Sequence, residues 1–101
     1  MKITFFSNFL NHHQLPFCKE MYECIGEDFR FVATEPVPEE RLNMGYHDMS
    51  TQYPFALNTY SSKKAYEEAV KLGNESDLVI IGSAPKLFIE NRLKANKLTF
   101  Y

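Results

Sequence analysis

Hydrophobic residues are grouped along the chain in short runs, and turn-forming residues separate the runs. Five runs have the length of β-strands, and they cover residues 2–6, 28–35, 56–60, 77–83 and 98–101. The runs KITFF and DLVIIGS are nearly continuous in apolar residues, which predicts strands that are buried on both faces. In the run at 28–35, apolar residues alternate with polar or small ones. The run at 56–60 is the weakest strand candidate of the five.

Between the strands, apolar residues recur at the spacing of α-helices. The first predicted helix covers residues 14–25, with Pro16 in its first turn, where a missing N–H costs nothing, and Gly26 as its C-terminal cap. Cys18 and Cys24 fall on different faces of this helix, so we expect two unpaired thiols. The apolar face of the helix consists of Leu15, Cys18, Met21, Tyr22 and Ile25.

Two further helices are predicted in the second half of the chain. One starts at the capping residue Ser62, runs to about residue 72 and ends at Gly73. The other starts at residues 83–85 and closes at Asn96. Their buried faces are expected to consist of Ala65, Tyr66, Ala69 and Val70 in the one, and of Leu87, Phe88, Ile89 and Leu93 in the other. Opposite charges four residues apart line the wet face of the former as Lys63–Glu67, Lys64–Glu68 and Glu67–Lys71.

The order of these elements predicts the fold class. Strands alternate with helices except at residues 36–55. This segment lacks a sustained periodicity of apolar residues and is predicted to be a long loop with a short helical turn at 39–43. Such alternation is typical of an α/β domain with a parallel sheet covered on both sides. Right-handed crossovers then give a Rossmann-like three-layer α/β/α domain over residues 1–101, with five parallel strands in the order 3-2-1-4-5.

The last predicted strand raises the question of what covers it. It ends at Tyr101, and no predicted helix covers that end of the sheet. Because sheets of this class bury both faces, we expect the chain to be the N-terminal fragment of a longer two-domain protein.

Composition narrows the range of partners. The 101 residues are 45% hydrophobic and include nine Phe and six Tyr, which is enough apolar surface for one small core. The net charge of −2 and the lack of a basic stripe argue against binding of nucleic acid. The longest apolar run, LVII at 78–81, is far too short to cross a bilayer, and we expect no signal peptide, because Asn8, Asn11, His12 and His13 interrupt the apolar residues after Lys2. These features predict a cytoplasmic protein.

In a sheet of this order, ligands bind at the switch point between the first and fourth strands, beyond their carboxyl ends. The loops at that point are 7–13 and 82–85, and both lead into predicted helix N-termini, which favour anionic groups such as phosphate. The candidate binding residues are therefore Asn8, Asn11, His12, His13 and Ser83. A solvated or turn-stabilising role remains an alternative for either histidine.

Several specific chemistries lack their motifs. The sequence contains no GxGxxG after the first strand, no GxxxxGK[ST] and no GxSxG, which disfavours dinucleotide binding, a P-loop and a hydrolase serine. Adjacent histidines do not share a helix face, and His47-Asp48 is the sole further group that could join them, so we expect no metal and no cofactor.

Glu67 and Glu75, with seven residues between them, are interpreted as surface charges. Tyr46, Tyr53 and Tyr60 are the tyrosines placed to stack on a sugar ring.

Two segments resemble a known family. MKITFFSNFLNHHQLPFCKEMY and NESDLVIIGSAP are similar to parts of the N-terminal half of bacterial GT-B-fold glycosyltransferases, the retaining kind that build surface polysaccharides. The resemblance implies a second half that binds most of a nucleotide-sugar donor, while this half binds a carbohydrate or lipid-linked acceptor. Asn8, Asn11, His12 and His13 would lie in the loop at the cleft, with Ser83 opposite. The chain departs from the family pattern in lacking the Gly-Gly often found in that loop.

The family implies that this half alone does not catalyse transfer. We expect the whole enzyme, like this chain, to be cytoplasmic, with the inner face of the membrane as an alternative location. A different class remains open, a stand-alone flavodoxin-like binding or interaction module without catalysis. Such a module would cover the open end of its sheet by forming a homo-oligomer.

Overall fold

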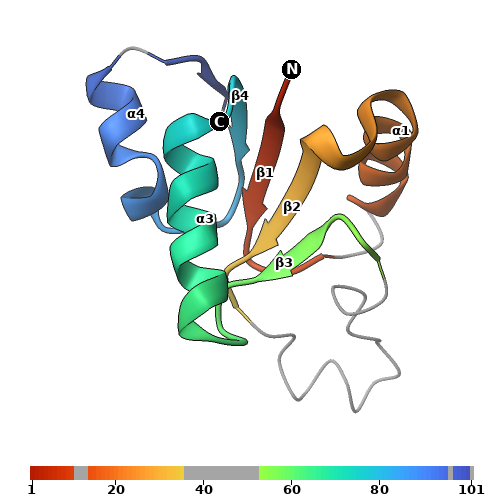
Figure 1. Cartoon of the computed structure of the whole chain (residues 1–101), viewed down its shortest axis with the longest axis horizontal. Coiled ribbons are helices and arrows are strands. Elements are labelled where there is room, and N and C mark those ends of the chain that lie inside the picture. Colours follow the sequence, from red (N-terminus) through yellow and green to blue (C-terminus); the bar gives the residue numbers. More distant parts are fainter. Residues whose placement is uncertain (11–13, 36–52, 96, 101) are drawn as a thin grey trace.

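The computed structural model describes residues 1–10, 14–35, 53–95 and 97–100 (Figure 1). The strands are β1 (Ile3–Ser7), β2 (Phe29–Ala33), β3 (Ala56–Asn58), β4 (Leu78–Ile81) and β5 (Thr99–Phe100). All neighbouring strands pair in parallel, in the order β3-β2-β1-β4-β5. The predicted α/β class and strand order are confirmed, although most of the strands are shorter than their apolar runs suggested.

The helices lie on both faces of this sheet. They are α1 (Leu15–Ile25), α3 (Lys63–Glu75) and α4 (Glu90–Lys94), with the short 3-10 turns η1 (Gly26–Asp28) and η3 (Lys86–Phe88). Helix α1 covers one face, and α3 and α4 cover the other (Figure 1). Within the described part of the chain, no helix is both long and apolar enough to span a bilayer.

The alternation of side chains along β1 and β2 divides the core into two clusters. Phe31 and its neighbours pack under α1, together with Phe29, Ile3, Leu10, Cys18 and Phe55. Phe6 and Val32 point the other way and pack under α3 and η3, together with Ala69, Val79, Ile81, Phe88 and Ile89. The α1 cluster is rich in aromatic contacts, such as the 5.3 Å between the ring centres of Phe5 and Phe31. This double core is what a parallel sheet with helices on both faces requires.

Helix α1 follows its prediction closely. Its predicted apolar residues all belong to the α1 cluster or pack against it, and Gly26 ends the helix with a positive φ of 60°. Both cysteines are free, with Cys18 buried and Cys24 exposed, as the helical spacing predicted. Burial raises the pKa of the Cys18 thiol to about 12, so this sulfur is a protonated part of the core and not a nucleophile.

Helix α3 begins as predicted and ends later. The Ser62 hydroxyl accepts a hydrogen bond of 3.0 Å from the Ala65 N–H, which caps the helix. The prediction that Gly73 ends the helix is wrong, because the helix continues through Gly73 to Glu75. A Cβ at position 73 would come within 2.0 Å of the Phe88 carbonyl oxygen, so glycine is present to let η3 approach α3. Glycine at position 73 is therefore explained by close packing against η3 and not by a role as the C-terminal cap of the helix.

The single helix predicted from 83–85 to Asn96 is also wrong. The segment forms the turn η3 and the short helix α4 instead. Phe88 and Ile89 are buried as expected, but the side chains of Leu87 and Leu93 are 47% and 39% exposed. The physical reason is Arg92, which occupies the inward position of α4 and turns the neighbouring Leu93 to solvent.

Arg92 is the largest fully buried side chain in the described part of the chain. Its Nη1 donates to the carbonyl oxygens of Gly73 at 2.9 Å and Ser76 at 2.8 Å, and its Nη2 donates to that of Leu98 at 2.6 Å. Its Nε donates to the Thr99 hydroxyl at 2.9 Å. The guanidinium thus joins the end of α3, the entry to β4 and the entry to β5.

Among the described residues, no carboxylate forms an ion pair with the Arg92 guanidinium. Burial lowers the pKa of Arg92, and the nearby charge of Asp77 acts in the opposite direction. The carbonyl oxygens at the C-terminus of α3 carry the negative end of the helix dipole, which also favours a cation there. The Asp77 carboxylate itself accepts the Lys2 N–H at 2.7 Å, so the same corner is tied to the start of β1.

Replacing Arg92 should therefore lower the free energy of unfolding. We expect Arg92→Met to lower the free energy of unfolding by about 3 kcal/mol or more, because buried carbonyl oxygens lose charge-assisted hydrogen bonds. Arg92→Lys should lower it by about 2 kcal/mol, since an ammonium group cannot reach all of these acceptors. Urea titration measures both. The control is Lys94→Met on the exposed side of α4, which should change it by under about 0.5 kcal/mol. Equal effects of Arg92→Met and Lys94→Met would contradict this role.

Candidate functional site

The two loops of the predicted crevice start side by side. Strand β1 pairs with β4 in parallel, so Ser7 at the end of β1 and Gly82 after β4 lie at the same edge of the sheet. The Gly82 N–H donates to the Phe6 carbonyl oxygen at 2.8 Å. A Cβ at position 82 would lie only 3.3 Å from the Ser7 Oγ, so a small residue lets the two loops approach. We call this place the carboxyl edge.

The loop after β1 is fixed by its own polar side chains. The Ser7 Oγ accepts a hydrogen bond of 3.0 Å from the Gln14 Nε2 and lies 3.4 Å from the Asn8 Oδ1. The Asn8 Oδ1 also accepts the Phe9 N–H at 2.7 Å, which is a typical turn-forming contact of asparagine. The side-chain oxygen of Asn8 therefore shapes the loop, and its Nδ2 has no hydrogen bond within the described part of the chain.

Strand β2 and the core hold the same loop from below. The Thr34 N–H and hydroxyl donate to the Ser7 carbonyl oxygen at 3.0 and 3.1 Å, and the Glu35 N–H donates to the Asn8 carbonyl oxygen at 2.8 Å. The side chains of Phe9 and Leu10 are 6% and 1% exposed, so they anchor the loop in the core. The loop backbone is thus positioned as far as residue 10. Asn11, His12 and His13, which the sequence predicts as binding residues, lie outside the described residues.

The loop after β4 presents Ser83 to solvent. Its side chain is exposed and makes no hydrogen bond to the described residues, while the Ala84 N–H donates to the Gly82 carbonyl oxygen at 2.9 Å in a tight turn. The predicted helix N-terminus behind this loop is not formed, because residues 86–88 are a single 3-10 turn. The helix N-terminus that does form at this edge is that of α1. Its N-cap residue Gln14 provides no side-chain capping hydrogen bond.

The tyrosines predicted to stack on a sugar ring and the groups considered as metal ligands fall only partly within the described residues. Tyr53 stacks on Phe55 with ring centres 5.3 Å apart, and Lys19 Nζ lies 5.6 Å from the Tyr53 ring centre, so it packs against the core. Tyr60 is 41% exposed near the end of β3. Tyr46 and the pair His47-Asp48 lie outside the described residues. Among the residues that the structure does describe, no three His, Cys, Asp or Glu side chains gather as metal ligands would.

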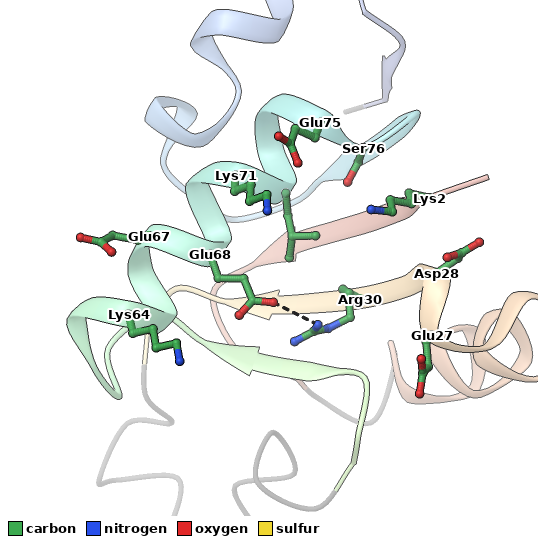
Figure 2. A pocket seen from close by; sticks show the side chains of 11 residues that line it. Lys2, Glu27, Asp28, Arg30, Lys64, Glu67, Glu68, Lys71, Glu75 and Ser76 are labelled. Carbon is green, nitrogen blue, oxygen red and sulfur yellow. Dashed lines mark hydrogen bonds and ion pairs between the residues drawn. The ribbon is translucent and has the colours of Figure 1, made fainter.

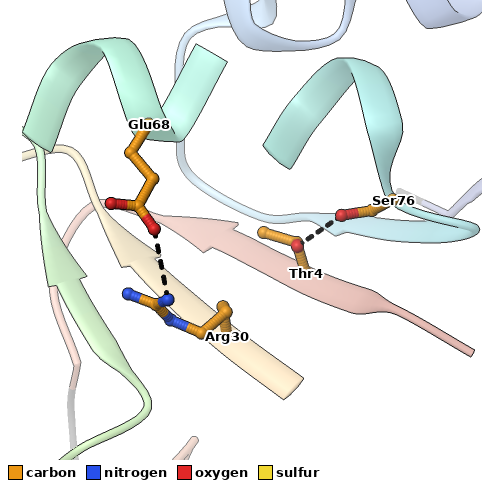
Figure 3. A network of polar contacts seen from close by, with 4 residues as sticks. All are labelled: Thr4, Arg30, Glu68 and Ser76. Atoms are coloured by element: carbon orange, nitrogen blue, oxygen red, sulfur yellow. Dashed lines mark hydrogen bonds and ion pairs between the residues drawn. The ribbon is translucent and has the colours of Figure 1, made fainter. Parts of the chain in front are cut away.

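Sequence reasoning missed a polar row at the opposite edge of the sheet. Thr4 and Arg30 are partners in the β1–β2 register, and both point toward α3. The hydroxyl groups of Thr4 and Ser76 are 2.7 Å apart, and the Arg30 Nη1 lies 3.4 Å from the Glu68 Oε1 (Figure 3). The predicted pair Lys64–Glu68 is replaced by this contact between α3 and β2. The available signal was Thr4 within a strand predicted to be buried, and Arg30 at a polar position of the alternating second strand.

A hollow of about 440 Å³ opens above this row, and we call it the amino-edge hollow (Figure 2). It includes Glu67 and Glu75, which the sequence assigned to the surface. It is lined by Lys2, Glu27, Asp28, Arg30, Lys64, Glu67, Glu68, Lys71, Leu72, Glu75 and Ser76. Lys2, Asp28 and Ser76 precede β1, β2 and β4, so this hollow opens toward the amino ends of the strands and away from the switch point.

Comparison with known proteins finds no relative of this chain. The chain matches no protein-family model, no curated protein and no solved structure. The structure supports a small α/β domain with a parallel five-stranded sheet, and the chemistry of its sites has to be argued from its own residues.

The two serines of the carboxyl edge should behave differently when replaced. Ser7→Ala removes an acceptor from Gln14 in a buried place, so we expect the free energy of unfolding to fall by about 1 kcal/mol. Ser83→Ala removes an exposed hydroxyl and should change it by under about 0.5 kcal/mol. Urea titration of both variants measures the difference. A loss of stability in Ser83→Ala as large as in Ser7→Ala would show that Ser83 belongs to the scaffold.

Proposed function

We propose that this chain is the acceptor-binding, N-terminal half of a glycosyltransferase that moves a sugar from a nucleotide-sugar donor to a surface polysaccharide or a related acceptor. The observation that carries the proposal is the sheet order, which puts the loops after β1 and β4 side by side at a switch point. The likeness of the segments at 1–22 and 74–85 to the GT-B family gives this edge a substrate class. That likeness covers a first half only, so the donor would contact mainly a second half.

The chemistry of the carboxyl edge agrees with binding of a hydroxyl-rich ligand. Asn8 Nδ2 and the Ser83 hydroxyl have no hydrogen-bond partner among the described residues and lie on loops whose backbones are held by the strands, so both suit hydrogen bonding to a ligand. Asn11, His12 and His13 follow in the sequence of the same loop. In this proposal, His12 or His13 positions the acceptor hydroxyl or a phosphate by hydrogen bonding and does not act as a nucleophile.

The reading frame of the gene beyond the codon for Tyr101 gives the first test. We expect it to continue for several hundred codons, roughly the size of a further α/β domain with its insertions, and to encode a second Rossmann-like half. A stop codon directly after Tyr101 would contradict the transferase proposal. It would favour the alternative of a stand-alone binding module.

Kinetics of the two-half protein give the second test. With a nucleotide-sugar donor, His12→Ala and His13→Ala are expected to raise the acceptor KM, with at least one of them doing so by about tenfold, because each removes a possible hydrogen bond to the acceptor. The matched control is Glu23→Gln on the exposed side of α1, which should leave KM and kcat unchanged. Unaltered KM and kcat in both histidine variants would show that the loop does not bind substrate.

A further inference from the structure

The amino-edge hollow has the size of a ligand site. Its volume of about 440 Å³ falls within the range of roughly 300–1,000 Å³ that small-molecule sites occupy. It exists because β1 and β2 carry Thr4 and Arg30 toward α3, whereas two residues further along the same face Phe6 and Val32 fill the core. Leu72 provides an apolar wall, and charged side chains surround it.

Arg30 lies in this hollow with little of its hydrogen-bonding capacity used. A guanidinium carries five N–H donors, but in the described part of the chain the only hydrogen bond of Arg30 is the long contact of 3.4 Å from Nη1 to Glu68. Its Nε is buried and has no partner, and 27% of the side chain is exposed. A half-buried cation with so few acceptors is stabilised by any anion that can reach its free Nη2.

The charges around Arg30 favour such an anion. Figure 2 shows the ammonium groups of Lys2 and Lys71 turned toward the space beside Arg30, where Glu68 is the nearest carboxylate. Glu27 and Glu67 point away from that space in the same view. Of the remaining carboxylates, Asp28 lies 3.7 Å from the amino group of Met1, which offsets its charge, and Glu75 stands at the rim beside Ser76.

We propose that the amino-edge hollow binds the phosphate group of a small molecule through Arg30, Lys2 and Lys71. The hollow is lined by four cations and five carboxylates, of which Lys2, Lys71 and Arg30 face the space beside Glu68. A phosphate monoester carries a charge of about −1.5 to −2 at neutral pH, which suits these three cations. The fork of Arg30 suits the geometry of phosphate oxygens, and Leu72 contacts an apolar part of the molecule. This site is separate from the carboxyl edge and does not depend on the transferase proposal.

The test is a titration of the ¹⁵N-labelled 101-residue chain with inorganic phosphate, followed by NMR at constant ionic strength. We expect saturable shifts in the millimolar range at the amides of Lys2, Arg30, Lys71 and Leu72. Acetate at equal concentrations is the comparison ligand, and it should bind about tenfold more weakly because it carries less charge and fewer acceptor oxygens.

Matched variants of α3 separate a specific site from general attraction to lysine. Lys71→Gln removes a cation of the hollow, whereas Lys63→Gln removes one from the same helix that does not line it. Lys71→Gln should weaken phosphate binding about fivefold to tenfold, and Lys63→Gln less than about twofold. Arg30→Lys should weaken it by a similar factor to Lys71→Gln, since it keeps the charge and loses the fork.

Three results would overturn the proposal. They are the absence of saturable shifts, equal binding of acetate and phosphate, and equal losses in Lys71→Gln and Lys63→Gln. Thermal unfolding of each variant checks that it is folded before titration. Lys71 is exposed, so its replacement leaves the fold intact and keeps the test decisive even where Arg30→Lys destabilises the chain.

Discussion

The buried guanidinium of Arg92 is the constraint on which the second half of the sheet depends. It binds the carbonyl oxygens of Gly73 in the last turn of α3, of Ser76 between α3 and β4, and of Leu98 directly before β5, so a single side chain holds the starts of two strands. Because β4 pairs with β1 in a fixed register, the start of β4 also determines where β4 ends. The position of Gly82 beside Ser7 is therefore linked to a charge at the opposite edge of the sheet. Gly73 serves the same arrangement, since its lack of a Cβ lets the Phe88 carbonyl oxygen approach α3.

The face of the sheet under α3 is divided between packing and polar chemistry. Toward the carboxyl ends of the strands, Phe6 and Val32 form a dry core with Phe88, whose ring stacks on Phe6 at 5.3 Å between centres. Toward the amino ends, Thr4 and Arg30 replace apolar residues, and α3 faces them with charged side chains. The hydrogen bond between Thr4 and Ser76 is buried, so the polar row remains part of the scaffold where it meets the end of α3. This division gives the small domain two polar regions on opposite edges.

Most of the fold could be predicted from the sequence because it depends on local patterns. The apolar runs identified all five strands, and the helical spacing of Leu15, Cys18 and Tyr22 identified the buried face of α1. The predictions failed where long-range contacts overrule a local signal. Gly73 reads as a helix end until the approach of η3 is known, and residues 83–96 read as one helix until Arg92 is seen to be the inward residue.

The candidate sites were predictable to different degrees. The pairing of the loops after β1 and β4 follows from strand order, which is a general property of parallel sheets. The use of Asn8 and Gln14 to brace Ser7 depends on side-chain geometry that spacing does not contain. The amino-edge hollow was missed because Thr4 and Arg30 are single polar residues in strands, and only the register shows that they are neighbours facing the same helix.

We propose that this domain binds carbohydrate at the carboxyl edge, at the switch point of the sheet. NMR titration of the ¹⁵N-labelled chain with free hexoses and disaccharides tests it most directly. We expect concentration-dependent shifts at the amides of Ser7, Asn8, Phe9, Gly82 and Ser83, and none at Lys2, Arg30 or Lys71. Shifts confined to the amino edge, or no shifts at millimolar sugar, would contradict it.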